Sequence, residues 1–192
     1  MNLSCSFDVK GAYYSLMGTL QAKEKQNAQA IGYFSKAAAS SFPESRLYAR
    51  YGLATLYADM GESHAALVLL DEIVQELSNE KTEHKGPEKE LLYRVLYNRG
   101  LCLYTLEEFE KAAASFRSAL LVDSSRWNAK RNLELSLLAH VKKRNSAVSA
   151  GAVSAEKKDL PNPVLFDYIR QKEMDRWKNQ QWKGTEESAI DY

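Results

Sequence analysis

The feature that most constrains this chain is a pair of small residues 12 positions apart, which occurs three times. The pairs are Gly18 and Ala30, Ala54 and Ala66, and Gly100 and Ala112. A bulky residue follows four positions after the second member of each pair, and another apolar residue follows three positions later. These residues are Phe34 and Ala37, Leu70 and Ile73, and Phe116 and Ala119. Because spacings of i, i+4 and i+7 lie on one helix face, each occurrence predicts a helix that buries this face.

Each occurrence is predicted to be a helical hairpin, that is, two helices joined by a short turn. The turns are expected at AKEKQN (22–27), DMGES (59–63) and TLEE (105–108). A glycine inside a helix costs about 1 kcal/mol relative to alanine, so close packing should compensate at Gly18 and Gly100. We expect the small residue of the first helix to let the second helix of the same unit approach. The bulky residue of the second helix should then fill the space between units.

Three segments carry this pattern in phase, and they resemble the tetratricopeptide repeat (TPR). They read YSLMGTL…AIGYFSKA, GLATLYADMGESHAALVLLDEI and LYNRGLCLYTLEEFEKAAASFRSAL. The resemblance covers residues 11–126 and implies an all-α fold, a right-handed helical-hairpin solenoid of three TPR units. The repeats are spaced by 36 and 46 residues, whereas about 34 is usual. Arg50 and Arg99 replace the family's apolar residues, which is expected to weaken local packing.

The segment after the third unit, SSRWNAKRNLELSLLAHVKKR, is predicted to form a C-terminal capping helix. Such a helix would cover the inner face of the last repeat, which water would otherwise reach. Its apolar residues keep helical spacing. They are Trp127, Leu133, Leu137, Leu138 and Val141.

The chain as a whole is predicted to have four parts. They are an N-terminal extension (1–10), a TPR domain with its capping helix (11–144), a flexible linker (145–159) and a C-terminal tail (160–192). Asn162 followed by Pro163 predicts the start of a separate tail helix. Apolar anchors on this helix predict docking onto the solenoid or onto another protein. These tail residues are Phe166, Ile169, Trp177 and Trp182.

Composition and charge argue against several classes of function. A formal net charge of +1 gives no strong field to attract nucleic acid. His64, His84 and His140 lack metal-ligand spacing and are far apart in the inferred fold. Cys5 and Cys102 have no nearby cysteine, and Cys102 is expected to be a small core residue. We therefore predict that the protein is not an enzyme, with no catalytic residue, metal, cofactor or small-molecule substrate.

A stack of hairpins offers a concave face lined by the first helices, on which such solenoids bind partners. Tyrosines combine apolar area with a hydroxyl group and are common binding anchors. Helical spacing places ten candidate residues on this face. They are Ser15, Thr19, Tyr48, Tyr51, Thr55, Arg94, Tyr97, Asn98, Leu101 and Tyr104. We therefore predict a non-catalytic scaffold or adaptor that binds a partner protein or peptide through this groove, the tail, or both.

One well-known ligand class is not expected. TPR proteins of the chaperone-adaptor kind carry a clamp of lysines and asparagines on this face, which grips a C-terminal carboxylate. Here Ser15 and Thr19 occupy the matching places in the first unit, and Gly52 occupies the one in the second. Arg94 and Asn98 in the third unit are the remaining similar polar residues. The clamp is missing, so a chaperone tail is not the expected ligand.

The N-terminus suggests an alternative function. MNLSCSFDVK lacks a charged n-region and an apolar h-region, so the chain as written is expected to be cytoplasmic. If a leader precedes it, LSC followed by serine resembles a lipoprotein processing site. Cys5 would then be lipidated, and the protein would organise a membrane-associated complex in the periplasm or at the membrane.

A basic cluster on the capping helix suggests a third function, the binding of nucleic acid or anionic lipid. It comprises Arg126, Lys130, Arg131, Lys142, Lys143 and Arg144. The cap segment AKRNLELSLL and the tail segment LFDYIRQKEMDRW are also weakly similar to repeat proteins of bacterial aerotolerance-type (Bat) operons, which are envelope-associated.

Overall fold

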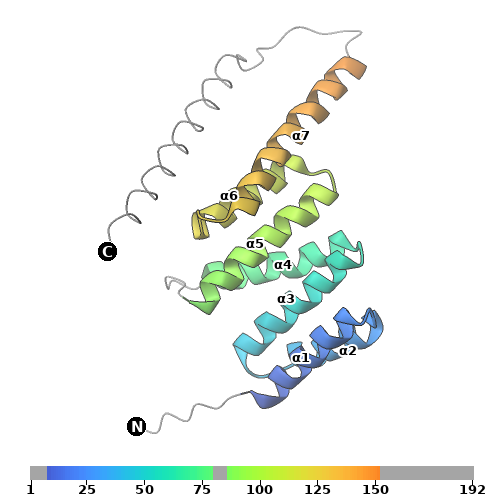
Figure 1. Ribbon diagram of the computed structural model, residues 1–192, viewed down its shortest axis with the longest axis vertical. Helices are drawn as coiled ribbons and strands as arrows, with labels where there is room; N and C mark the ends of the chain where they lie inside the picture. The colour runs from blue at the N-terminus through green and yellow to red at the C-terminus, as the bar shows by residue number, and fades with distance from the viewer. Residues whose placement is uncertain (1–7, 80–85, 152–192) are drawn as a thin grey trace, which may run out of the picture. The chain divides into compact units, whose positions relative to one another are not determined.

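The computed structural model describes residues 8–79 and 86–151, and these residues are organised as α-helices without a strand (Figure 1). The helices are α1 (Val9–Lys23), α2 (Asn27–Ala38), α3 (Pro43–Asp59), α4 (Ser63–Asn79), α5 (Pro87–Thr105), α6 (Phe109–Val122) and α7 (Trp127–Gly151). Residues Met1–Ser146 belong to one compact unit, and Ala147–Tyr192 belong to a second. All packing described below lies within the first unit.

The helices pair as three hairpins, α1 with α2, α3 with α4, and α5 with α6. Successive hairpins stack, because α3 packs on α1 and α2, and α5 packs on α3 and α4 (Figure 1). This arrangement confirms the predicted all-α helical-hairpin solenoid.

The three hairpin turns share one backbone geometry. In each turn the residue seven positions after the small residue has a positive φ, with values of 59° at Lys25, 84° at Gly61 and 58° at Glu107. The N–H group of the next residue donates to the carbonyl five positions earlier, which is the long-range bond of a Schellman motif. These bonds are Gln26 to Gln21, Glu62 to Tyr57 and Glu108 to Leu103, each 2.9 Å long. The repeat therefore fixes the turn even where the residue at positive φ is not glycine.

The small-residue pattern is explained by the core. Ala30, Ala66 and Ala112 are fully buried. At Gly18 and Gly100, a Cβ atom would lie 2.8 Å from the Phe34 ring and 2.6 Å from the Phe116 ring, respectively. The glycines therefore make room for an aromatic ring of the second helix, which explains their presence in mid-helix.

Arg50 and Arg99, which the sequence predicted to weaken local packing, form ion pairs with carboxylates of α4. Arg50 on α3 forms an ion pair with Glu76 on α4. Arg99 on α5 donates its Nε to Asp71 on α4 at 2.5 Å and also donates to Ser115. Both arginines thus connect α4 to a first helix. These ion pairs could not be predicted from the local sequence pattern, because the carboxylates lie 26 and 28 positions away along the chain.

Helix α7 covers the third hairpin, but not with the face that the sequence predicted. Ala129 and Ser136 are fully buried, and Leu133 packs against the cluster around Phe116. Three of the predicted capping residues, Trp127, Leu137 and Leu138, are instead exposed. Small residues lie at the interface because they let two helices approach closely, which apolar periodicity alone does not reveal.

The same helix runs to Gly151, so residues 145–151 of the predicted linker are helical. In the part of the chain that the structure covers, no helix combines the length and apolar character needed to cross a bilayer.

Candidate functional site

A groove of about 610 Å³ lies between the first helices of the three hairpins. Its walls come from α1, α3 and α5, and Phe34 of α2 contributes to its lining. The apolar part of the lining consists of Leu16, Ala22, Phe34 and Leu56. The groove therefore has an apolar interior formed by elements from several repeats.

Two glycines give the Phe34 ring its place in this groove. A Cβ atom at Gly18 of α1 would lie 2.8 Å from the ring, and one at Gly52 of α3 would lie 2.5 Å from it. The ring is thus enclosed by two successive first helices, where it packs with Ala30 and Leu56. The sequence predicted this position between units, and the structure confirms it.

Two tyrosines of α3 supply hydroxyl groups to the groove. Burial raises the pKa of both Tyr48 and Tyr51, so both phenols are neutral at physiological pH. Tyr51 accepts a hydrogen bond of 3.1 Å from the Asn98 amide of α5, which links two repeats. Neutral phenols with fixed rings suit hydrogen bonding to the backbone of a bound chain.

Charged groups line the groove on each of its three helices. They are Lys23 on α1, Asp59 on α3 and Arg94 on α5. Arg94 donates its Nε to Glu90 at 2.7 Å, and this hydrogen bond raises the guanidinium pKa. Both signs of charge are present, so the groove is not a dedicated anion site.

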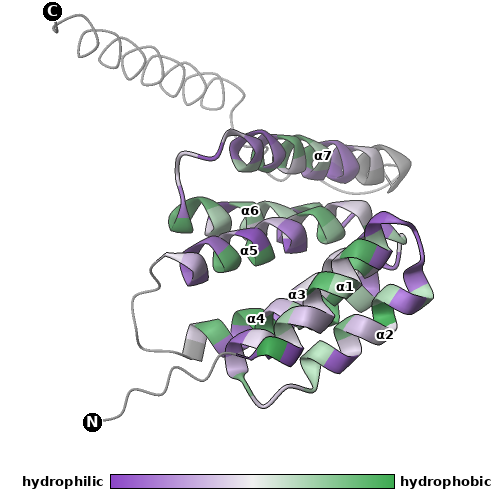
Figure 2. Ribbon diagram, turned by 60° about the horizontal axis from the view of Figure 1, so that its bottom comes forward, coloured by the Kyte–Doolittle hydropathy of each residue, from purple (hydrophilic) through white to green (hydrophobic). Residues whose placement is uncertain are grey.

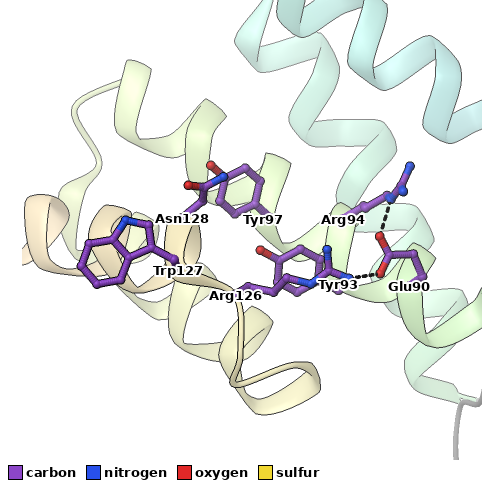
Figure 3. Close-up of a pocket in the computed structure, with 7 residues that line it drawn as sticks. All are labelled: Glu90, Tyr93, Arg94, Tyr97, Arg126, Trp127 and Asn128. Carbon is purple, nitrogen blue, oxygen red and sulfur yellow. Dashed lines mark hydrogen bonds and ion pairs between the residues drawn. The ribbon is translucent and has the colours of Figure 1, made fainter. Parts of the chain in front are cut away.

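A second, smaller cavity of about 300 Å³ lies between α5 and the start of α7 (Figure 3). Glu90 joins two arginines there, since it pairs with both Arg94 and Arg126 (Figure 3). The Arg126 guanidinium lies 4.7 Å from the centre of the Tyr93 ring. The Nε of Arg126 also donates a hydrogen bond of 2.6 Å to the Asp123 carboxylate. The arginine is therefore held on an aromatic face by two carboxylates.

The structure divides the ten predicted groove residues into four groups. Six line the larger groove: Ser15, Thr19, Tyr48, Tyr51, Thr55 and Arg94. Tyr97, together with Arg94, lines the smaller cavity, where Tyr97 also accepts a 2.9 Å hydrogen bond from Asn132 of α7. Asn98 supports Tyr51 from behind. Leu101 and Tyr104 line neither cavity, although both are exposed.

Several lining residues were not predicted, namely Leu16, Glu90, Tyr93, Trp127 and Asn128. Leu16 lies one residue after the predicted Ser15, and its helical spacing from Tyr13 and Leu20 was the sequence signal that could have identified it. The residues of α7 were missed because only the stacking of α7 on α5 brings them to this face.

The structure also bears on the role of Cys102 and on the side chains that could hold a metal ion. Cys102 is buried in the cluster between α4 and α5, as expected, and burial raises its thiol pKa. Its thiolate fraction is therefore small, which fits a packing role. Over the described residues, the side chains of histidine, cysteine, aspartate and glutamate do not gather into a group that could hold a metal ion.

The basic cluster of the capping helix is partly neutralised by the protein itself. Arg126 is paired as described, and Lys143 forms an ion pair of 3.1 Å with Glu107. The tail residues Phe166, Ile169, Trp177 and Trp182, and the predicted lipidation site Cys5, lie outside the described residues.

Comparison with known proteins supports the fold. No protein-family model matches the chain, and no curated protein matches it either. Among solved structures, the first TPR domain of Spaghetti (RPAP3) bound to the HSP90 peptide SRMEEVD has a TM-score of 0.57 at 14% identity, covering 69% of this chain and 96% of that one. The first TPR domain of human RPAP3 has a TM-score of 0.57 at 16% identity, covering 71% and 97%. The Sgt2 TPR domain from Aspergillus fumigatus has a TM-score of 0.56 at 14% identity, covering 84% and 95%.

These matches confirm that the chain has the TPR fold, which the repeats alone had predicted. The weak similarity to Bat-operon proteins remains a prediction, since none of these matches bears on it.

Proposed function

We propose that the protein is a non-catalytic interaction scaffold whose groove between α1, α3 and α5 binds an extended segment of a partner protein. One observation carries this proposal: six residues chosen from three separate repeats by helical spacing line a single cavity of about 610 Å³. A groove of this size accommodates a few side chains of a peptide.

The lining indicates the chemistry of the bound segment. Phe34, Leu16 and Leu56 favour an apolar side chain directed at the floor of the groove. The neutral hydroxyl groups of Tyr48 and Tyr51 favour hydrogen bonds with the peptide backbone. The partner segment is therefore an extended peptide with an apolar anchor rather than a highly charged one.

The comparisons support peptide binding as the kind of function, because the Spaghetti domain with the same fold was solved with a bound HSP90 peptide. The ligand proposed here differs from that peptide. Ser15, Thr19 and Gly52 stand in this groove at the places where the chaperone clamp has charged or amide side chains. A strongly acidic tail would lack its main contacts.

The proposal is tested by selecting peptides from a random display library on the full chain and measuring their affinities by fluorescence anisotropy. Tyr48→Ala removes a groove anchor that is 42% exposed, and Tyr104→Ala removes an equally large ring that is 37% exposed and lies outside both cavities. We expect Tyr48→Ala to weaken binding about tenfold, or ~1.4 kcal/mol. The matched Tyr104→Ala variant should bind as the unaltered chain does. Peptides that bind all three proteins equally, or a selection that enriches none, would refute the groove as the binding site.

No structural observation favours the alternatives as a second function. Cys5 lies outside the described residues, and Arg126 and Lys143 of the basic cluster are engaged in ion pairs within the protein. Recognition through the tail remains a proposal that a chain ending at Asn145 would test, since losing the same peptides on truncation would assign them to the tail.

A further inference from the structure

Helix α1 exposes four of its large apolar residues and buries both of its glycines, Gly11 and Gly18. Val9, Tyr13, Leu16 and Leu20 are 67%, 52%, 67% and 45% exposed. Their spacing of four, three and four residues places them in one line along the helix, which we call the α1 stripe. Figure 2 shows the hydrophobic residues of α1, the first helix of the stack. Among the described residues, no element covers this stripe.

The corresponding positions in the other two repeats, aligned on Gly18, Ala54 and Gly100, indicate the structural role of the stripe. In α3 they include Ala49 and Leu56, and in α5 they include Leu91, Val95 and Cys102, all of which are buried. The other three equivalent positions are half-buried or carry small side chains. The α1 stripe is therefore the repeat's own stacking surface, here without a partner.

In α3 and α5 this surface is covered by the second helix of the preceding hairpin. Leu91 and Val95 share a core cluster with Leu70, Ile73 and Leu77 of α4. Leu56 likewise shares a core cluster with Ala30 and Phe34 of α2. The surface thus receives one helix that presents apolar residues at i, i+3 or i+4, and i+7 spacing.

An exposed apolar surface such as the α1 stripe is expected to bind a partner. The terminal unit of a solenoid normally has a polar outer face, because an apolar one drives association. Four large apolar side chains in one line also form a patch of the kind that marks interaction sites. The shape of the surface indicates a helix, so the remaining question is which charges that helix carries.

Charge selects among the possible occupants. Exposed lysines, Lys10 and Lys23, lie near the two ends of α1. The helix itself contains no acidic residue, and the carboxylates of its two cap residues, Asp8 and Glu24, accept hydrogen bonds from groups of the protein. Neither lysine forms an ion pair within residues 8–79 and 86–146 of the structure. A second copy of α1 in the parallel orientation would place lysine opposite lysine, which is unfavourable. The α4–α5 junction shows the favourable arrangement, in which Arg99 meets Asp71 beside an apolar contact.

We propose that the α1 stripe is a docking surface for an amphipathic helix of another protein that carries acidic residues beside its apolar face. The helix takes the position that the second helix of a preceding hairpin would hold. Its acidic residues pair with Lys10 and Lys23. This surface is separate from the peptide groove except at Leu16 and Lys23, which lie at the border of both.

Two synthetic helical peptides test the proposal on the full chain. Both carry leucines along one face; one has glutamates beside the leucines, and the other has lysines at the same positions. Fluorescence anisotropy should show that the glutamate peptide binds and that the lysine peptide binds about tenfold more weakly. Reversing the charges of the chain with Lys10→Glu and Lys23→Glu together should reverse this preference.

Two further variants assign the site. Replacing Val9 and Leu20 by glutamine should abolish binding of the glutamate peptide, and the fold should be retained because both side chains are exposed. Tyr48→Ala, which alters only the groove, should leave this affinity unchanged. The two proposals can therefore fail independently.

Three results would overturn the inference. One is equal binding of both peptides, or of neither, by the unaltered chain. Another is loss of binding in Tyr48→Ala but not in the variant of Val9 and Leu20, which would place the peptide in the groove. The third is a concentration-dependent dimer in analytical ultracentrifugation that the Val9 and Leu20 changes abolish, which would make a second copy the occupant.

Discussion

Replacing Gly100 by alanine should destabilise the protein, although alanine is the better helix former. The glycine is buried in the middle of α5. An added Cβ atom would lie 2.6 Å from Cε1 and 2.8 Å from both Cδ1 and Cζ of the Phe116 ring. That ring has no exposed surface and is held by Tyr97, whose ring centre is 5.6 Å away, and by Leu103 and Leu133. It therefore cannot move aside cheaply.

The two opposing effects can be estimated. Helix propensity favours alanine by about 1 kcal/mol, whereas overpacking of a core costs about 1–3 kcal/mol. A contact well below 3 Å in an enclosed core belongs at the upper end, so the net loss should be about 1–2 kcal/mol. Gly32 in α2 is the matched control, because an added Cβ there meets nothing within 4 Å. Gly32→Ala should therefore gain about 1 kcal/mol.

Thermal unfolding followed by circular dichroism can separate these outcomes. For a chain of this size, 1 kcal/mol corresponds to about 2–4 °C in Tm. Gly100→Ala should melt several degrees below the unaltered protein and Gly32→Ala a few degrees above it. If both substitutions raised Tm equally, the steric explanation of the glycine would be wrong.

The second repeat suggests a rescue for this substitution. At the positions equivalent to Gly100 and Phe116 it has Ala54 and Leu70, both fully buried. The double variant Gly100→Ala with Phe116→Leu reproduces that pair. Its loss of stability should be smaller than the sum of the two single losses, with a coupling of about 1–2 kcal/mol. Additive losses would show that the ring is not what the added methyl group meets.

Two further predictions concern the ends of the solenoid. Ser40 and the Gly11 N–H hydrogen-bond to the Asp8 carboxylate, which lowers its pKa. Asp8→Ala should lower Tm at neutral pH, because the ionised carboxylate stabilises the folded protein at any pH above the ordinary carboxyl pKa. This stabilisation is lost as the pH falls through the lowered pKa of the folded state. The melting curves of the variant and the unaltered protein should therefore converge in acid, and curves that stay apart would contradict this explanation. Asn132→Ala removes the donor to the Tyr97 hydroxyl and should cost about 1 kcal/mol. Amide hydrogen exchange in α7 should accelerate, and unchanged protection would show that this bond does not hold the helix.

The ion pairs of α4 show where sequence reasoning stopped. Arg50 and Arg99 break the apolar pattern of the repeat, and from the sequence they were expected to weaken it. Each forms an ion pair with a carboxylate on α4 more than twenty positions away, which the sequence did not predict. Local periodicity identifies an exception to a pattern, but it cannot identify a partner on another helix.

The candidate site was only partly predictable for the same reason. Helical spacing selected residues of the first helices, and three of these, Tyr48, Tyr51 and Arg94, line one groove. Tyr104 follows the same periodicity but lies beyond the end of that groove, where its ring packs on Phe109 at 5.1 Å. Spacing gives the face of a helix, whereas the position of a cavity along it depends on where neighbouring helices cross.

The sequence by itself determined the repeat, the helices and turns, and the core, because these depend on contacts between residues of one hairpin. A small residue, an alanine 12 positions later and a bulky residue after it specify how two helices pack, and a local pattern can encode that. Only the tertiary structure decided which face of α7 covers the last hairpin, which charges pair across repeats, and that the α1 stripe has no cover among the described residues. These features arise from the stacking of one hairpin on another, so they depend on distances that no short stretch of sequence contains.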